Sequence, residues 1–250
     1  MEKNYDLFAK DYHNKRRYHW KELEAFLEEI NNKENRYNGY NLDLGCANGR
    51  NFNLFLNPNS RLVGIDNSIE LLGFALERLK KQGNNSELNS KSINLILSDI
   101  RTLPLRDDAI ANIFSIATIH HIKENVHRKE VIEQLYRILK NGGFFLLTVW
   151  RRYQKKYRYY FIKVKIRRLL ILKYKKSQEI SGLIEFGDTY VPWTLSNREF
   201  IYNRFYHFFS RREIKNLVKN FKIKLITKRG GPNKKDNFFI LAQKVIEKGD

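Results

Sequence analysis

The stretch Leu42-Asp43-Leu44-Gly45-Cys46-Ala47-Asn48-Gly49-Arg50 decides the fold of this 250-residue chain. We expect a β-strand from Tyr40 to Leu44 and the start of a helix from Asn51 to Leu56. The small residues between them let the backbone approach a ligand closely. The spacing differs from the dinucleotide-binding pattern G-x-G-x-x-G, whose third glycine would fall on Arg50. The stretch therefore predicts a different kind of small-molecule site at a strand-to-helix turn.

An acidic residue, Asp43, stands two positions before the first glycine of this motif. A pyrophosphate group prefers helix N–H groups with no anion nearby. S-adenosylmethionine carries a sulfonium and an ammonium group, so a carboxylate at this position suits it. Taken alone, the motif also fits an ordinary glycine-rich turn, and the strands that follow favour the cofactor site.

Two further strands are expected to end in polar groups. The strand Arg61–Asp66 ends in a carboxylate about 20 residues after the motif, where it could accept both ribose hydroxyls. The strand Ser92–Leu97 is followed by Asp99 and Ile100, whose side chain and backbone N–H respectively could contact an adenine edge. These positions are consistent with one adenosine-containing ligand.

A fourth strand, Ile113–Ile116, leads into Ala117 to His121. A helix over Arg128–Leu139 is expected to end at the glycine stop Lys140–Gly143, before a fifth strand over Phe144–Trp150. The carboxyl ends of parallel strands meet at one edge of a sheet. The residues that follow these strand ends therefore predict a ligand at the switch point of a doubly wound, Rossmann-like α/β sheet.

The sequence after the basic segment predicts regular secondary structure. Asp188–Trp193 is interpreted as a loop, and Ser210 as the N-cap of a helix over Arg211–Asn220. Phe221–Lys228 and Asn237–Lys244 are expected to form a closing antiparallel hairpin.

Composition limits the class of protein. No apolar run approaches the roughly 18 residues that a bilayer span needs, and the N-terminus is polar rather than a signal peptide. The single cysteine, Cys46, excludes an internal disulfide and a cysteine-rich zinc site. We expect a cytoplasmic protein with no membrane span and no bound metal.

The formal net charge is +20, and much of it is concentrated in one segment. Arg151 to Lys176 holds twelve Lys or Arg, six aromatic residues and no acid. Cations bind phosphates and aromatic faces stack on unpaired bases, so this segment predicts a nucleic-acid partner. The alternative is a basic amphipathic helix on an anionic membrane surface, since Ile166 and Leu169 to Leu172 supply an apolar strip.

These features divide the chain into three parts. Residues 1–150 are expected to hold N-terminal helices and the cofactor-binding core. Residues 151–196 form a basic aromatic insertion for substrate binding. Residues 197–250 supply the C-terminal helix and the closing strands of the same core.

The chain resembles the class I S-adenosylmethionine methyltransferases, and within them the tRNA wobble-uridine carboxymethyl methyltransferases. The matching segments cover nearly the whole chain except the basic insertion: Tyr5-Asp6, Arg17-Tyr18, Trp20, Leu42–Gly49, Ser115–His121, Val149-Trp150, Tyr190–Trp193, Arg204–Phe209 and Asp236–Phe238. Two positions depart from the family pattern, Ala47 for a glycine and Phe238 for a tryptophan. Ala47 is tolerable if the backbone there does not need a positive φ.

The resemblance implies methyl esterification of a carboxymethyl group at C5 of the wobble uridine, in the anticodon loop of tRNA. It also implies S-adenosylmethionine as the cofactor and a small zinc-binding activator protein as a partner. Such a carboxylate is ionised at neutral pH, so it needs a group that holds it rather than a base. His121 is expected to be structural. The candidate catalytic residues are Arg17, His120, Arg204 and His207. The candidate cofactor-binding residues are Asp43, Gly45, Ala47, Gly49, Asp66, Asn67, Asp99, Ile100 and Ala117.

Other functions remain open at this point. The same fold could methylate a small molecule or another RNA, but a small-molecule substrate would leave the basic aromatic insertion unexplained. The chain could also be a non-catalytic cofactor-binding subunit. Intact acids at Asp43, Asp66 and Asp99 argue against that role.

Overall fold

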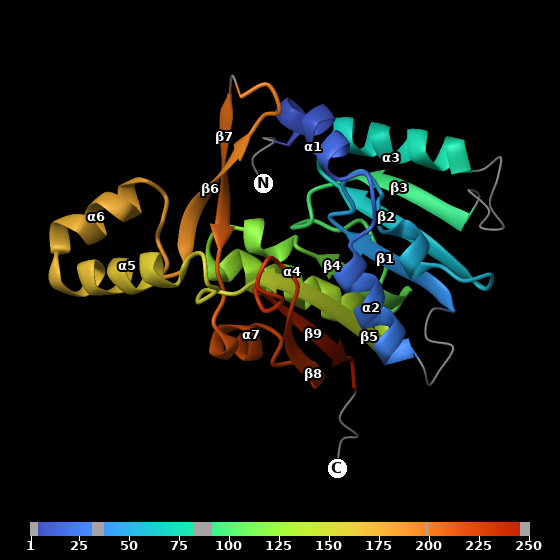
Figure 1. Cartoon of the computed structure of the whole chain (residues 1–250). Helices are drawn as coiled ribbons and strands as arrows, with labels where there is room; N and C mark the ends of the chain where they lie inside the picture. Colours follow the sequence, from blue (N-terminus) through green and yellow to red (C-terminus); the bar gives the residue numbers. More distant parts are fainter. Residues whose placement is uncertain (1–4, 32–37, 83–91, 199, 246–250) are drawn as a thin grey trace, which may run out of the picture.

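The computed structural model describes residues 5–31, 38–82, 92–198 and 200–245, and its centre is a seven-stranded sheet. The strand order is β3-β2-β1-β4-β5-β9-β8 (Figure 1). The first five strands in this order pair in parallel, whereas β9 is antiparallel to both β5 and β8. The bounds are β1 Gly39–Leu44, β2 Ser60–Asp66, β3 Ile93–Leu97, β4 Ile110–Ile116, β5 Leu139–Trp150, β8 Lys222–Arg229 and β9 Asn237–Gln243. The predicted doubly wound sheet with a C-terminal antiparallel hairpin is confirmed.

Helices cover both faces of the sheet. On one face, α2 (Lys21–Asn31), α3 (Ile69–Gln82) and the 3-10 turn η2 (Phe52–Phe55) share a core cluster with the strands. On the other face, α4 (Asn125–Ile138) and α7 (Arg211–Leu217) contribute to a second cluster. With both faces covered, the central strands are mostly apolar along their length rather than alternating.

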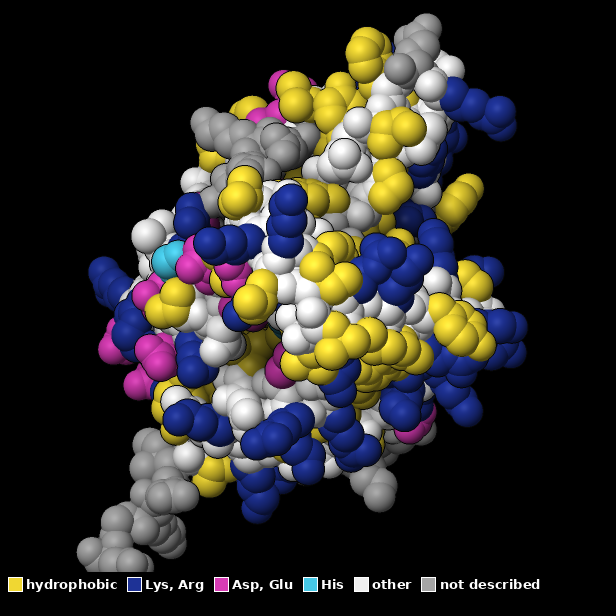
Figure 2. All heavy atoms as spheres, turned by 90° about the vertical axis from the view of Figure 1, so that its left-hand side faces the viewer, with side chains coloured by type: hydrophobic (Ala, Val, Ile, Leu, Met, Phe, Trp, Pro, Cys, Tyr) yellow, Lys and Arg dark blue, Asp and Glu magenta, His cyan; other side chains and the backbone are white. Residues whose placement is uncertain are grey.

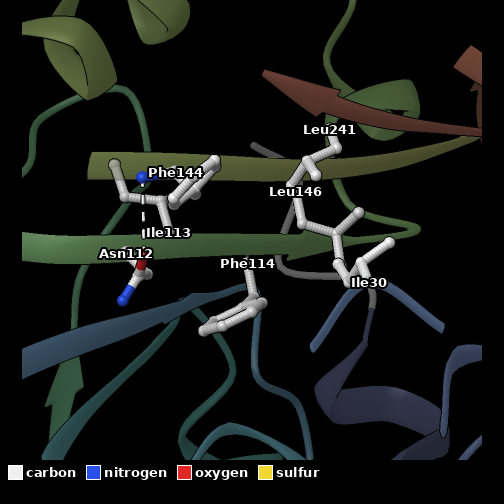
Figure 3. A pocket seen from close by; sticks show the side chains of 7 residues that line it. All are labelled: Ile30, Asn112, Ile113, Phe114, Phe144, Leu146 and Leu241. Atoms are coloured by element: carbon white, nitrogen blue, oxygen red, sulfur yellow. Dashed lines mark hydrogen bonds between the residues drawn. The ribbon is translucent and has the colours of Figure 1, made fainter. Parts of the chain in front are cut away.

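The core is closely packed beneath α2. The rings of Phe55 and Phe114 stack with centroids 4.0 Å apart. Figure 3 shows a hollow of about 10 Å³ between Ile30 of α2 and the strands β4 and β5, where the Phe144 N–H donates to the Asn112 side-chain oxygen at 3.4 Å. Such a volume has room for about one water molecule. This hollow is therefore part of the core packing.

Three local predictions were wrong. The segment Asn51–Leu56 forms only the single 3-10 turn η2, because Leu56 is already extended and the Phe55 carbonyl accepts a bond from the Asn41 side chain at 2.9 Å. The helix α4 does not end at the glycines: Leu139 is extended and begins β5, so Gly142 and Gly143 lie inside that strand.

The third error is the segment Asp188–Trp193, which forms a strand rather than a loop. β6 (Asp188–Thr194) pairs with β7 (Ile201–His207) in a separate antiparallel hairpin. The proline in β6 is accommodated because, among the residues that the structure describes, the hairpin has two strands and each has an unpaired edge. The predicted N-cap at Ser210 is confirmed, since its side chain forms a reciprocal capping box with Glu213.

The basic segment forms an arm that stands apart from the sheet. α5 (Arg158–Leu170) and α6 (Leu172–Ile180) project beside the β6–β7 hairpin (Figure 1). Phe161 and Val164 are the buried side chains of α5, and Phe161 packs with Phe208. Figure 2 faces this side and shows exposed hydrophobic side chains bordered by Lys and Arg. The boundary expected between residues 196 and 197 lies between the paired strands β6 and β7, and the division into parts stays a prediction.

The N-terminal segment, η1 (Asp6–Phe8) and α1 (Ala9–Lys15), links the hairpin to the core. The Trp193 indole N–H donates to the Asp11 carboxylate at 2.8 Å, and the Lys15 ammonium donates to a β6 carbonyl at 2.7 Å. Residues of this segment and of the hairpin both line a cavity beside the carboxyl ends of the parallel strands.

Candidate functional site

A cavity of about 560 Å³ lies where the parallel strands end. Ligand pockets for small molecules have volumes of roughly 300–1,000 Å³. Seven residues that the sequence suggested line it: Gly45, Ala47, Asp66, Asn67, Ala117, His120 and Arg204. We call Gly45, Ala47, Asp66, Asn67 and Ala117 the cofactor half. We call His120, Gln154, Arg204 and Asp236 the acceptor half.

Asp66 at the end of β2 is fixed within the cofactor half. One carboxylate oxygen accepts the Ala47 N–H at 2.8 Å, and the other accepts the Ser68 N–H at 3.0 Å. Burial raises the pKa of Asp66 above its ordinary value, against the effect of these backbone hydrogen bonds. Because each carboxylate oxygen has two lone pairs, both oxygens can still accept ribose hydroxyls.

The turn after β1 brings the backbone close to the ligand space. Gly45 has a φ of +73°, and an added Cβ would come within 2.4 Å of the Thr118 side chain. Ala47 has a φ of +49°, so the condition for tolerating alanine there is not met. A left-handed conformation costs a non-glycine residue roughly 1–2 kcal/mol. The turn keeps the conformation that the family's glycine would adopt without strain.

Asp43 at the end of β1 is a buried acid beside this turn. Burial and the nearby charge of Asp66 raise the pKa of Asp43 to about 8. A cation bound nearby would favour the ionised form, since opposite charges lower the pKa of an acid. The fixed Asp66 carboxylate and the turn line the cavity, whereas Asp43 is buried outside its lining, so a contact between Asp43 and S-adenosylmethionine stays a prediction.

Four candidate cofactor residues, Asp43, Gly49, Asp99 and Ile100, lie apart from the lining of this cavity. Asp99 is ion-paired with Arg101 at 2.7 Å, and Ile100 is buried. Gly49 packs against the Phe52 ring. Contact between Asp99 or Ile100 and an adenine edge therefore stays a prediction.

His120 is the most enclosed residue of the acceptor half. Its side chain is fully buried, and within the described residues neither ring nitrogen has a hydrogen-bond partner. Its ring stacks on Tyr206 with centroids 4.7 Å apart. Burial, followed by neighbouring positive groups, holds the pKa of His120 well below its ordinary value. His120 is therefore neutral at physiological pH, with both ring nitrogens available to a ligand.

Arg204 brings a permanent positive charge to the same half. Its guanidinium lies over the Trp193 ring at 4.7 Å and the Tyr206 ring at 5.1 Å. Its Nε is buried without a partner among the described residues. Arginine cannot be deprotonated in proteins, and its planar fork matches a carboxylate. The arrangement is therefore suited to an anionic acceptor.

The other two candidate catalytic residues lie elsewhere. Arg17 is exposed at the end of the N-terminal segment, where its side chain contacts Asn14 at 3.3 Å, and the preceding residue, Arg16, lines the cavity instead. His207 points to the opposite side of β7 from Arg204, because residues three apart on a strand face opposite ways. A catalytic role for Arg17 or His207 stays a prediction, without support from this cavity.

His207 belongs to a buried polar cluster on the other side of β7. It bonds to the Asp188 carboxylate at 2.7 Å, and burial lowers the pKa of His207. Glu185, Asp188 and His207 bring possible metal-ligand atoms within 4.8 Å of one another. Arg128 already pairs with Glu185, so the cluster is satisfied by protein groups. His121 lines the cavity but contacts the Tyr5 hydroxyl and the Phe205 carbonyl at 2.9 Å each, which is consistent with the expected structural role.

Two residues of the acceptor half were missed from the sequence, Gln154 and Asp236. Gln154 lies within the insertion, which was interpreted by its positive charge and its aromatic residues, so this neutral side chain was not considered. Asp236 lies in the segment Asp236–Phe238, which resembles the family, and this resemblance could have identified it as a candidate site residue. Among the described residues, no helix is both long and apolar enough to cross a bilayer.

Comparison with known proteins agrees with this geometry. Residues 42–147 match the family described as methyltransferase domain. A protein of Schizosaccharomyces pombe named tRNA (carboxymethyluridine(34)-5-O)-methyltransferase is 25% identical over 96% of this chain and 94% of its own length. One with the same name from Arabidopsis thaliana is 32% identical over 60% of this chain.

The chain matches only 32% and 60% of the lengths of the first two curated relatives. Among solved structures, an S-adenosylmethionine-dependent methyltransferase from Methanosarcina mazei has a TM-score of 0.65 at 19% identity, covering 88% of this chain and 98% of its own. One from Clostridium acetobutylicum has a TM-score of 0.64 at 17% identity, covering 97% and 99%. The core of this chain thus has the fold of the class I, S-adenosylmethionine-dependent methyltransferases, and residues 42–147 within it match the methyltransferase domain family.

Proposed function

We propose that this chain is an S-adenosylmethionine-dependent tRNA methyltransferase that esterifies the carboxymethyl group at C5 of the wobble uridine. The observation that carries the proposal is the Arg204 guanidinium, stacked between Trp193 and Tyr206 in the same cavity as Asp66. A cation in an aromatic-walled cavity favours an anionic acceptor. The names of the relatives support the same substrate.

The reaction needs little proton chemistry from the protein. Bound S-adenosylmethionine supplies a methyl group activated by its sulfonium. A carboxymethyl group is ionised near neutral pH, so one of its oxygens can attack without a general base. Arg204 holds the other oxygen, and the aromatic walls exclude water and fix the alignment. His120 can donate one hydrogen bond to the acceptor without adding charge.

The second part of the proposal is that the arm binds tRNA. Of its twelve cations, Arg152 and Lys175 are the ones with recorded ion pairs to acids within the described residues. Figure 2 shows Lys and Arg side chains gathered on this side of the molecule, which the arm shares with the hairpin that lines the cavity. We expect tRNA affinity to fall steeply with salt, and Lys163→Glu with Lys165→Glu to reduce the slope by about two. Binding to anionic vesicles but not to tRNA would favour the membrane alternative.

Two further elements of the proposal follow from the family resemblance. We place the protein in the cytoplasm, where tRNA is available, and we include a small zinc-binding protein as a candidate activator. Co-purification of such a protein with the tagged chain, together with higher turnover in its presence, would support the second element. Full turnover by the chain alone would exclude a required activator.

The test compares two anticodon stem-loops that differ only in the carboxymethyl group at C5 of the wobble uridine. With labelled S-adenosylmethionine, we expect methylation of the carboxymethylated stem-loop alone, and release of the label by mild alkali because the product is an ester. Equal labelling of both stem-loops, or a product stable to alkali, would overturn the proposal. In that case Asp236, the carboxylate in the acceptor half, would be the candidate base for a neutral acceptor.

A further inference from the structure

Buried polar atoms without partners gather around the cavity. Ten buried side-chain nitrogen or oxygen atoms lack a hydrogen-bond partner within the described residues, and five of them belong to the acceptor half. They are both ring nitrogens of His120, Nε of Arg204, Nε2 of Gln154 and Oδ1 of Asp236. Because buried polar atoms in folded proteins nearly always have partners, this concentration points to a polar ligand.

Gln154 and Asp236 form a wall of the cavity that the carboxylate-binding role of Arg204 leaves unused. Their side chains are 6% and 4% exposed. Gln154 follows β5 and Asp236 precedes β9, and these strands meet where Trp150 pairs with Asn237. The Arg151 N–H donates to the Asp236 carbonyl at 3.0 Å, which holds the two segments together.

The Asp236 carboxylate is fixed by one oxygen and leaves the other for a ligand. Its Oδ2 lies 3.4 Å from the Asn233 backbone N–H and 3.5 Å from its side-chain amide. Its Oδ1 is buried with no partner among the described residues. This wall therefore presents one hydrogen-bond acceptor, Asp236 Oδ1, and one donor, Gln154 Nε2.

We propose that Asp236 and Gln154 recognise the Watson–Crick edge of the acceptor base and select uracil over cytosine. This inference rests on the proposed function. Uracil has an N3–H donor beside a carbonyl acceptor, so Asp236 accepts the N3–H and Gln154 donates to the carbonyl. Cytosine has an acceptor at N3 and a donor at N4, which would place an acceptor against the Asp236 oxygen. Unpaired bases are commonly read on this edge while they stack on aromatic side chains.

Aromatic side chains are in place for that stacking. Trp150, Tyr157 and Tyr206 line the cavity, with the Trp150 and Tyr206 rings 4.6 Å apart. Such walls contact any base in the same way, because every base has a π-face. The choice between bases therefore depends on the polar pair rather than on the stack.

The test is the variant Asp236→Asn, which changes one atom at the cavity wall. The amide oxygen can take the place of Oδ2 and keep the Asn233 contacts, so that the NH₂ group replaces Oδ1. We expect kcat/KM for a stem-loop with 5-carboxymethyluridine to fall about 10- to 100-fold relative to the same stem-loop with 5-carboxymethylcytidine. Gln154→Glu, which places an acceptor against the uracil carbonyl, should shift the same ratio. Asp107→Asn, at an exposed carboxylate outside the cavity lining, is the matched control and should leave the ratio unchanged.

Binding of the two stem-loops is measured alongside turnover, with cofactor affinity as a check on folding. An unchanged uridine-to-cytidine ratio in both assays would overturn the assignment. An equal loss for both bases with intact cofactor binding would also overturn it, and would indicate a role of Asp236 outside base selection. If the wild-type chain binds the uridine stem-loop selectively but transfers no methyl group, the proposed function fails, and the binding ratio of Asp236→Asn still decides the assignment.

Discussion

The two halves of the cavity differ in how their polar groups are satisfied. In the cofactor half, both oxygens of Asp66 already accept backbone hydrogen bonds, from Ala47 and Ser68. In the acceptor half, five buried polar atoms have no partner within the described residues. The protein itself thus fixes the geometry of the cofactor half, whereas we expect the acceptor half to obtain partners from the substrate.

This difference indicates how the acceptor half can select its ligand. A buried polar group without a partner costs roughly 1–3 kcal/mol, so a ligand that displaces water from the acceptor half must supply partners for these atoms. An acceptor with matching donors and acceptors avoids that cost. Selectivity for the acceptor follows, because a ligand with a different pattern leaves the same groups unpaired.

Among the variants that test the difference between the two halves, Asp66→Ala in the cofactor half is expected to have the largest effect. The substitution removes two charge-assisted hydrogen bonds to the ribose, each contributing about 1.5–3 kcal/mol. We expect the affinity for S-adenosylmethionine, measured by calorimetry, to fall about 100-fold or more. Asp107→Asn should bind the cofactor like the wild-type chain. Wild-type affinity in Asp66→Ala would show that the cofactor does not bind at the end of β2.

The second effect is expected from Arg204→Ala, which should affect only the acceptor half. Loss of a charge-assisted bond to the acceptor carboxylate costs about 1.5–3 kcal/mol, so kcat/KM should fall roughly 10- to 150-fold. Cofactor affinity should stay within about twofold. Arg17→Ala is the comparison variant, because Arg17 lies outside the cavity lining. If Arg17→Ala lost more turnover than Arg204→Ala, the boundaries of the acceptor half would be wrong.

The third effect concerns pH and the buried acid Asp43. Its pKa is about 8 in the folded, cofactor-free chain, against an ordinary value of 3.8. Between pH 4 and pH 8 the folded chain therefore binds more protons than the unfolded chain, and this carboxyl makes stability fall as pH rises. Asp43→Asn should remove that part of the decline and raise the free energy of unfolding at pH 8 by at least about 1 kcal/mol. Urea unfolding at pH 5 and pH 8 measures the free energy of unfolding. An equal change between the two pH values in the wild-type and Asp43→Asn chains would refute the prediction.

The smallest effect is expected from Ala47→Gly in the cofactor half. Glycine removes the strain of a positive φ, roughly 1–2 kcal/mol, and loses about 0.5–1 kcal/mol through greater freedom in the unfolded chain. We expect a net stabilisation of about 0.5–1 kcal/mol with unchanged cofactor affinity. Ala25→Gly, on the exposed face of α2, should instead destabilise by about 1 kcal/mol. Destabilisation by Ala47→Gly would mean that Ala47 makes contacts worth more than the strain.

The cofactor half could be predicted from the sequence because it is built locally. The acids and small residues follow directly from strand ends, and parallel strands bring those ends to one edge of the sheet. That logic located Gly45, Asp66 and Ala117. It could not show that Asp99 pairs with its neighbour Arg101, because that contact depends on side-chain conformation.

The acceptor half could be predicted only in part, because it is assembled from distant segments. Gln154 lies between β5 and α5, Arg204 in β7 and Asp236 just before β9, with no fixed spacing between them. Arg204 and His207 looked equivalent until β6 and β7 proved to be strands, whose alternation places them on opposite sides. The short turn η2 was missed because the hydrogen bond from Asn41 that ends it comes from β1.

A crystal structure with S-adenosylhomocysteine and a 5-carboxymethyluridine stem-loop would test most directly whether cofactor and acceptor bind in the two halves of this cavity. We expect the ribose hydroxyls to bind Asp66 and the acceptor carboxylate to lie within hydrogen-bond distance of Arg204, in one cavity. A carboxymethyl group lying away from Arg204, or a cofactor bound away from the end of β2, would contradict this expectation.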